Sequence, residues 1–148
     1  QVPLAGVCFG HQLIAAEVGA QVGPAPGGWN IGVIDYEVTD SPPWLNLPGR
    51  YSLIASHQDQ VLTVSSDMEL MATAATCPVG AFTVGSNVIC VQGHPEFVPP
   101  LAASLYKSRI ERIGLDAVEK ALATLEQQLD RHDVAHWLLQ TIYQGSPA

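Results

Sequence analysis

The sequence predicts a mixed α/β domain, and three observations support this. An apolar run at residues 2–7 leads directly into apolar residues at helical spacing, which is the pattern of a strand followed by a helix. Runs of strand character fill the middle of the chain, and helical periodicity returns after Pro99. The 148 residues are 47% apolar and only 14% charged, which suits one folded domain and excludes extensive disorder.

The first strand and helix have clear signals at both ends. The uninterrupted apolar character of residues 2–7 is typical of a buried parallel strand. Residues 11–19 repeat apolar side chains with helical spacing, and Gly19 is a suitable helix stop. Glycine and proline at residues 23–28 predict a loop, and three prolines at residues 41–49 predict another connection.

The remaining elements follow from alternating or continuous apolar patterns. We expect strands at residues 30–38, 51–55, 61–64, 70–74, 81–85 and 88–92. After Pro99, apolar residues from Leu115 to Leu129 recur on one helical face, and residues 133–143 predict a last helix. We find no internal repeat and no linker that would divide the chain.

Composition excludes several classes of partner. Fourteen acidic and six basic residues give a net charge of −8, the wrong sign for binding a phosphate backbone. No apolar stretch reaches the roughly 18 residues that span a bilayer. Cys8, Cys77 and Cys90 lack a disulfide or metal-ligand spacing, so we expect free thiols in a cytoplasmic protein that binds neither nucleic acid nor membrane.

The segment Gly6-Val7-Cys8-Phe9-Gly10 has the form of a nucleophile elbow. A sharp turn between a strand and a helix would lift the Cys8 sulfur out of the sheet, and glycines on either side would leave room for it. The N-terminus of the following helix should favour a thiolate, and the backbone N–H of Phe9 could help to hold an oxyanion. A small buried cysteine in a glycine-rich turn is the alternative.

A thiolate nucleophile needs a base, and the base needs a group that orients it. The segment Gly93-His94-Pro95-Glu96 follows an apolar strand and supplies both side chains. Pro95 stiffens the loop, so Glu96 can accept a hydrogen bond from one nitrogen of His94 while the other nitrogen faces Cys8. A plain surface turn is the alternative interpretation of this segment alone.

The stretches GVCFGHQL, SHQDQV and GHPEF, in this order, resemble the three signature stretches of class I glutamine amidotransferase domains. The resemblance covers residues 4 to about 100 and implies a flavodoxin-like open sheet. It also implies that Cys8 attacks the side-chain amide of glutamine to form a γ-glutamyl thioester. His94 would protonate the leaving ammonia and then activate water, with Glu96 orienting it, and no cofactor or metal would be needed.

The same resemblance implies a set of substrate-binding residues. These are Gln12, the oxyanion-side residues Phe9 and Gly10, and the segment formed by Ser56, His57, Gln58 and Asp59. In the family, the main chain of the corresponding segment holds the α-amino and α-carboxylate groups of glutamine. A hydrogen-bonded turn between two strands is an equal alternative for this segment.

Two further stretches, GGWNIGV and VAHWLLQTIYQ, resemble the free-standing, GMP-synthase-like amidotransferases. This subgroup implies an ammonia-accepting synthase or a homo-oligomer as partner. Two other functions stay open, namely a hydrolase of γ-glutamyl conjugates and a non-catalytic amidotransferase-like subunit. Trp29 and Trp137 are expected to pack rather than to contact a substrate.

The position of Cys8 raises a further expectation. Only seven residues precede it, whereas in the family several central strands come before the nucleophile. We therefore expect residues 1–148 to be the C-terminal part of one amidotransferase domain that lacks its N-terminal strands. Residues 1–98 would carry the catalytic motifs and the sheet, and residues 99–148 the C-terminal helices.

Several residues imitate functional sites. His132 and His136 lie four residues apart on a probable helix, as in zinc proteases, but Asp133 stands where that motif has glutamate and no third ligand follows. His11 is expected to pack or to cap a helix. Cys77 and Cys90 are expected to be small structural residues.

Overall fold

A six-stranded mixed sheet forms the centre of the protein, with strand order β1-β8-β7-β6-β3-β4. The structure, a computed structural model, describes residues 2–144. The strands of this sheet are β1 (Leu4–Val7), β3 (Asn30–Val38), β4 (Arg50–His57), β6 (Glu69–Ala74), β7 (Cys77–Val84) and β8 (Val88–Val91). Only β1 and β8 pair in parallel, and the other neighbouring strands of this sheet are antiparallel. The expectation that the first strand is parallel is therefore confirmed, but the expectation that it is buried is wrong, because β1 lies at the edge of the sheet and Leu4 is 48% exposed.

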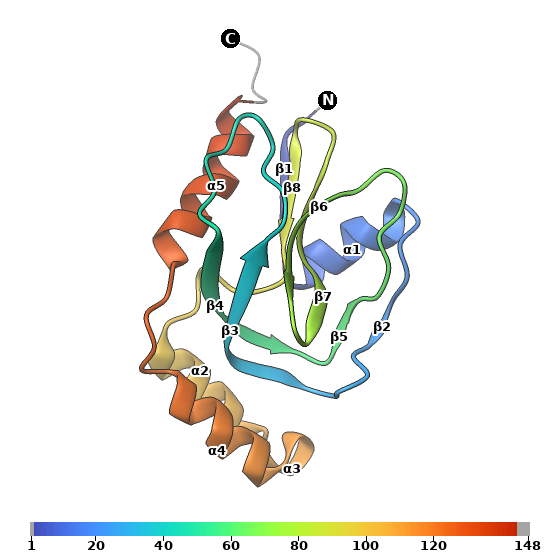
Figure 1. The fold of residues 1–148 in the computed structure, drawn as a ribbon. Coiled ribbons are helices and arrows are strands. Elements are labelled where there is room, and N and C mark those ends of the chain that lie inside the picture. Colours follow the sequence, from blue (N-terminus) through green and yellow to red (C-terminus); the bar gives the residue numbers. More distant parts are fainter. Residues whose placement is uncertain (1, 145–148) are drawn as a thin grey trace.

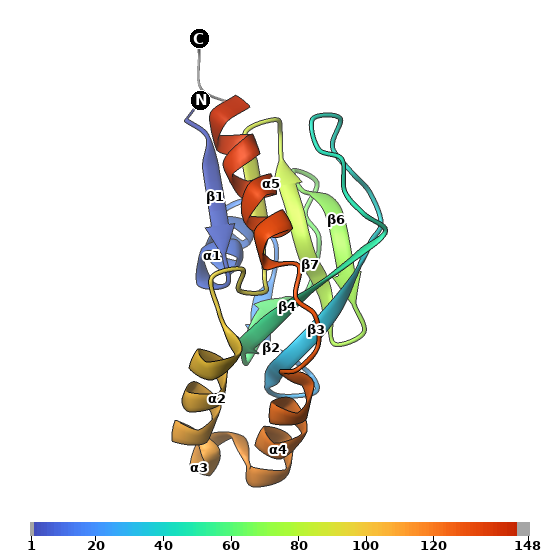
Figure 2. The same ribbon diagram turned by 90° about the vertical axis from the view of Figure 1, so that its left-hand side faces the viewer.

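The helices lie in two layers and a cap (Figures 1 and 2). They are α1 (Phe9–Glu17), α2 (Pro99–Ser108), α3 (Ile110–Ile113), α4 (Leu115–Thr124) and α5 (Arg131–Gln144). Helices α1 and α5 pack on opposite faces of the sheet, and α2, α3 and α4 cluster at one end, below β3 and β4 in Figure 1. None of the helices between residues 2 and 144 combines the length and the apolar character that crossing a bilayer requires.

Each helical layer seals its own part of the apolar core. Ala15 of α1 is fully buried and belongs to a cluster with Phe82 of β7. Trp137 of α5 packs edge-on against Tyr51 of β4, with ring centroids 5.3 Å apart. On α2, the hydroxyl of Tyr106 donates to the carbonyl of Ala55 and accepts from the N–H of Gly32, so the cap is tied to β3 and β4.

The sheet curls so that its last strand returns to the end of β8. Ile54 of β4 forms an isolated bridge with His94, whose N–H donates to the Ile54 carbonyl at 2.9 Å. Strands β4 and β8 are not neighbours in the strand order, yet the middle of β4 meets the segment that follows β8 here. This contact places the two later sequence motifs side by side.

Three differences from the predicted elements have physical reasons. Part of the expected loop at 23–28 is strand β2 (Val22–Pro24), because it finds an antiparallel partner in β5 (Asp59–Val61). That partner is shifted from the expected strand at 61–64. The expected helix at 115–129 ends at Thr124, although Leu125 and Leu129 beyond it still pack into the core. The spacing of the apolar residues therefore predicted which side chains pack into the core, but not where the helix ends.

Candidate active site

Cys8 lies in the sharp turn between β1 and α1, as the elbow pattern predicted. Its φ of 50° and ψ of −101° make it the sole non-glycine residue with positive φ among residues 2–144. Such a conformation is costly for a side chain that carries a Cβ, and it is typical of nucleophile elbows. The pairing of β1 with β8 and the start of α1 hold the backbone in this state.

The two elbow glycines have different roles. A Cβ on Gly6 would approach the Gly10 carbonyl carbon and the Ile14 side chain to 2.9 Å, and the Cys90 sulfur to 3.0 Å. A Cβ on Gly10 would meet no heavy atom within 4 Å. The prediction that the turn requires a minimal side chain is therefore confirmed for Gly6 and wrong for Gly10, because Gly10 already lies in α1.

The Cys8 thiol is partly shielded from solvent. Burial raises its pKa above the ordinary value, and the negative charge of Glu96 adds to this rise. Two hydrogen bonds oppose it, one from the backbone N–H of Phe9 and one from Gln92, whose Nε2 donates to Cys8 Sγ at 3.6 Å. The backbone N–H at the start of α1 favours the thiolate, as expected, but burial outweighs this contribution, so the net pKa of Cys8 is raised.

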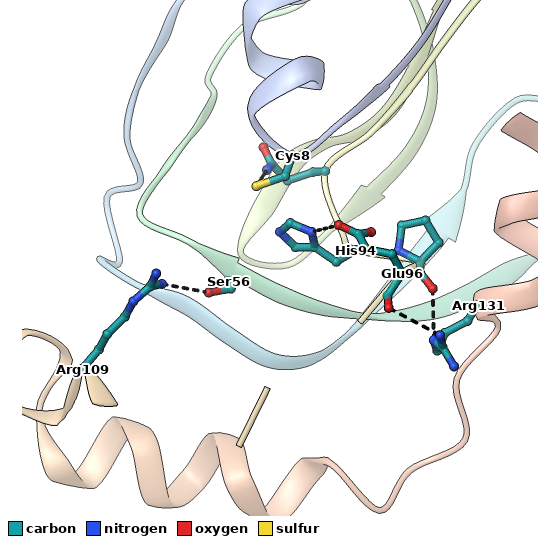
Figure 3. Close-up of polar contacts among 8 residues, drawn as sticks. Cys8, Ser56, His94, Glu96, Arg109 and Arg131 are labelled. Atoms are coloured by element: carbon teal, nitrogen blue, oxygen red, sulfur yellow. Dashed lines mark hydrogen bonds and ion pairs between the residues drawn. The ribbon is translucent and has the colours of Figure 1, made fainter. Parts of the chain in front are cut away.

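His94 and Glu96 form a close pair after β8. The Nδ1 atom of His94 lies 2.6 Å from Oε1 of Glu96, and its ring stacks on Phe97 with centroids 3.9 Å apart. Figure 3 shows the imidazole between the Glu96 carboxylate and the side on which Cys8 lies. No hydrogen bond joins Cys8 Sγ to His94 in the part of the chain that the structure describes. Catalytic hydrogen bonds are often long before substrate binds.

Arg131 at the start of α5 supports this turn from behind. Its Nε donates to the carbonyl of Pro95 at 3.0 Å, and its Nη2 donates to the carbonyl of Glu96 at 3.5 Å (Figure 3). The carbonyl groups of Pro95 and Glu96 are therefore both held by a side chain that is distant in sequence. Sequence reasoning missed Arg131, which follows an irregular segment and belongs to no motif.

Gln12 links the elbow to the segment that follows β4. Its Nε2 donates to the carbonyl of Asp59 at 2.8 Å and to Oε1 of Gln92 at 3.3 Å. Because Gln92 also contacts Cys8, a continuous chain of amide contacts connects the nucleophile to the β4–β5 turn. Gln92 was also missed, although a polar residue at the end of an apolar strand was a usable signal.

His57 belongs to the structure of this turn. Its Nδ1 lies 3.0 Å from the Asp59 carbonyl, and burial lowers its pKa to about 4. His11 is fully buried, packs on Phe82 at 4.9 Å between centroids, and has a pKa lowered by burial to about 3. Both rings are therefore neutral near pH 7, and the expectation that His11 packs is confirmed.

An open pocket of about 320 Å³ gathers much of the predicted site. Its lining consists of Cys8, Gln12, Trp29, Ser56, His57, Gln58, Asp59, Arg109 and Arg112. Phe9, Gly10, His94 and Glu96 are not among the lining residues, and Phe9 is 72% exposed. Trp29, which the sequence suggested as a packing residue, and the two arginines are additions from the structure.

The described side chains form no cluster of metal ligands. Between residues 2 and 144 there is no group of three or more His, Cys, Asp or Glu side chains placed to hold a metal ion. Cys77 and Cys90 are free and buried, and burial raises the pKa of each thiol to about 12. Cys8 is thus the least buried of the three thiols.

Comparisons with known proteins point to one family. The family model described as "Glutamine amidotransferase class-I" matches residues 1–109. The chain is 32% identical to gamma-glutamyl peptidase 3 of Arabidopsis thaliana, with 62% of this chain and 40% of that protein covered. It is 34% identical to a subunit of the glutamine-hydrolyzing GMP synthase of Thermococcus kodakarensis, with 76% of this chain and 61% of that relative covered.

Solved structures share the fold. A glutamine amidotransferase from Thermotoga maritima superposes with a TM-score of 0.72 at 23% identity, over 96% of this chain and 61% of that one. The chain thus spans less than two thirds of the length of each of these three proteins. The match over residues 1–109, joined to an elbow cysteine and a paired histidine and glutamate, places this chain in the class I glutamine amidotransferase family.

Proposed function

We propose that this protein hydrolyses the side-chain amide of glutamine through a γ-glutamyl thioester on Cys8, and delivers the ammonia to an acceptor. One observation carries the proposal. The strained elbow at Cys8 opens into the 320 Å³ pocket, and the His94–Glu96 pair lies beside it. Membership of the amidotransferase family supports the same chemistry.

The proposed reaction begins with a neutral thiol. As Cys8 Sγ attacks the γ-carbonyl carbon, His94 accepts the thiol proton, and the Glu96 carboxylate stabilises the imidazolium that forms. The backbone N–H of Phe9, which already contacts the sulfur, is placed to donate to the developing oxyanion. The tetrahedral intermediate then breaks down: its carbon–nitrogen bond is cleaved, His94 returns the proton to the leaving ammonia, and a thioester remains.

The second half repeats the proton transfers with water. His94 takes a proton from water as the oxygen attacks the thioester carbon. The carbon–sulfur bond then breaks, glutamate forms, and His94 returns the proton to the leaving sulfur. The raised pKa of Cys8 is compatible with this scheme, because the thiol is deprotonated during attack rather than beforehand. Gln92 can donate to the departing sulfur, since its amide already points at Sγ.

A second candidate is hydrolysis of γ-glutamyl conjugates by the same residues. The similarity to a protein named gamma-glutamyl peptidase 3 favours it, and so does the open form of the pocket, which leaves space beyond the reacting carbonyl. The similarity to part of a GMP synthase instead favours a synthase partner that receives the ammonia. Both reactions pass through the same γ-glutamyl thioester and differ only in the amine that leaves.

The test is product release by the full-length protein and its Cys8→Ser variant. We expect the unsubstituted protein to release ammonia from glutamine, or an amine from γ-glutamyl peptides, and the variant to lose this activity. Comparing glutamine with γ-glutamyl peptides separates the two candidates, and stimulation of the glutamine rate by a synthase favours the first. Undiminished release by Cys8→Ser would exclude Cys8 as the nucleophile. A lack of release from every substrate would favour a non-catalytic role.

A further inference from the structure

Two arginines line the catalytic pocket of a strongly acidic chain. The protein has only six lysines and arginines against fourteen acidic residues, yet Arg109 and Arg112 both contribute to the wall of the pocket that contains Cys8. They come from the junction of α2 and α3, where a separation of three residues allows both side chains to extend to the same side. Basic side chains are thus concentrated at this pocket.

Each guanidinium is positioned by a neutral partner. Arg109 Nη1 donates to Ser56 Oγ at 3.5 Å, and Figure 3 shows this contact across the site from Cys8. The Arg112 guanidinium carbon lies 5.2 Å from the centre of the Trp29 ring, within the range of a cation–π contact. Both partners also line the pocket, so both contacts direct the arginines toward it.

Neither arginine is neutralised by an acid. The ion pairs among residues 2–144 are Arg50 with Asp35 and His94 with Glu96, so no described carboxylate lies within 4.0 Å of either pocket guanidinium. Asp59 is the only acidic residue that lines the pocket. Two uncompensated positive charges at a concave surface favour an anion, and the planar guanidinium fork matches a carboxylate.

We propose that Arg109 and Arg112 form a carboxylate-binding site in the wall of the catalytic pocket, which holds an anionic end of a γ-glutamyl substrate. The proposal rests on the proposed function, because it assumes that the γ-carbonyl of the substrate lies at Cys8. The carboxylate has two possible sources. One is the α-carboxylate of the γ-glutamyl group, and the other is a carboxylate on the amine that leaves. Asp59 is available to pair with the substrate's α-amino group.

Binding is measured by calorimetry on full-length protein carrying Cys8→Ala, which removes turnover. The ligands form two pairs that each differ in one carboxylate. Glutamine is compared with its α-carboxamide, and γ-glutamylglycine with γ-glutamylmethylamide. Arg109→Gln, Arg112→Gln and the double variant are tested in this background, and Arg50→Gln is the matched control because Arg50 pairs with Asp35 away from the pocket.

We expect the double variant to weaken binding of the carboxylate-bearing ligand of one pair by roughly tenfold or more, as for a charged hydrogen bond. The partner ligand without that carboxylate should change less than about twofold, and Arg50→Gln should change neither. If affinity falls for glutamine but not for its α-carboxamide, the arginines bind the α-carboxylate. If affinity falls for γ-glutamylglycine but not for γ-glutamylmethylamide, the arginines bind the carboxylate of the amine that leaves.

Equal losses for all four ligands, unchanged affinities, or no binding to protein with both arginines intact would each overturn the proposal. Ammonia and amine release by protein with Cys8 intact is measured separately. Product release that persists while the arginine variants bind normally would reject the carboxylate site and leave the proposed function standing. Selective binding of the carboxylate without any product release would support the carboxylate site and reject the proposed function.

Discussion

Cys8 combines a strained backbone with a half-buried sulfur whose pKa is raised. The positive φ directs its side chain into the pocket, while burial and the charge of Glu96 raise the pKa of the thiol. The reactivity of this thiol therefore depends on a neighbouring base and on hydrogen bonds that stabilise a thiolate as it forms. Among the described residues, Gln92 and the N–H of Phe9 provide such bonds.

Alkylation with iodoacetamide should distinguish Cys8 from the other thiols. Between about pH 6 and about pH 10 we expect the rate at Cys8 to rise with pH, because only the thiolate reacts, and its midpoint to exceed that of an unperturbed cysteine. Cys77 and Cys90 should stay unmodified in the folded protein, since burial raises the pKa of each to about 12. Peptide mass spectrometry gives all three rates.

The Gln92→Leu variant tests whether the hydrogen bond from Gln92 lowers the pKa of Cys8. It should move the Cys8 midpoint to higher pH, because the lost hydrogen bond is one of the contacts that lower the pKa. A Cys8 midpoint below the ordinary thiol value would contradict the raised pKa of this half-buried sulfur.

The Glu96 carboxylate is expected to orient His94 rather than to touch substrate, because it contacts Nδ1 at 2.6 Å and is absent from the pocket lining. Glu96→Ala should lower kcat by roughly 10²-fold or more while KM for the preferred substrate changes little. Glu126→Ala, an exposed acid beyond α4, should change neither constant. A rise in KM at constant kcat would assign Glu96 to substrate binding instead.

The β1–α1 unit achieves its turn by close backbone approach. Gly6 at the end of β1 lies against the main chain of Gly10 in the first turn of α1, and no space remains for a side chain between them. Besides β1 and α1, strand β4 and helix α5 also reach the site. Strand β4 bridges to His94, and α5 contributes Arg131. The elements thus position the site through contacts to its main chain, made by the backbone of β4 and by the Arg131 side chain.

Substitution of the two elbow glycines should give opposite results. Gly6→Ala inserts a methyl group within about 3 Å of three heavy atoms and should reduce the free energy of unfolding by roughly 1–3 kcal/mol. Gly10→Ala meets no atom within 4 Å and lies in a helix, so it should be neutral or stabilising by up to about 1 kcal/mol. Urea denaturation measures both, and equal effects would contradict the steric difference.

On the scale of the whole molecule, β1 is an edge strand. Within the described residues it pairs only with β8, so its other side has no hydrogen-bonding partner strand. Large apolar side chains are exposed on and around it, namely Val2, Leu4, Phe9 and Leu13. An open edge beside exposed apolar groups favours association with another strand.

Residues 1–148 expressed by themselves should therefore associate with increasing concentration and lack hydrolase activity. Leu4→Lys should reduce this association, because a charge on an edge strand opposes pairing, whereas Leu139→Lys should not, since Leu139 is equally exposed but lies on α5. Light scattering and ammonia release give the two readouts. A stable, fully active monomer of these residues would show that the edge needs no partner strand.

The order of elements and the family were accessible from the sequence because they depend on local signals. The expected strand at residues 30–38 matches β3, and the alternation that predicted it arises from the pleat of a single strand. The Cys8 elbow and the His94–Glu96 pair were accessible for the same reason, since two-residue separations fix which side chains meet. The burial of Cys90 was accessible from its apolar strand, whereas for Cys77, beside Pro78, the sequence left a buried residue and a loop residue open, and the structure shows it buried.

Only the tertiary structure decided how these parts act together. The bridge between Ile54 and His94 holds the segment after β8 against β4, near Cys8, and no local pattern encodes that approach. The helix N-terminus, which favours a thiolate at Cys8, is visible in the sequence, whereas the burial that outweighs it and raises the Cys8 pKa adds contributions from many segments. Arg109, Arg112 and Arg131 reach the site from helices in which the sequence marks no function. Their roles depend on where those helices pack, which is fixed by apolar contacts across the whole chain.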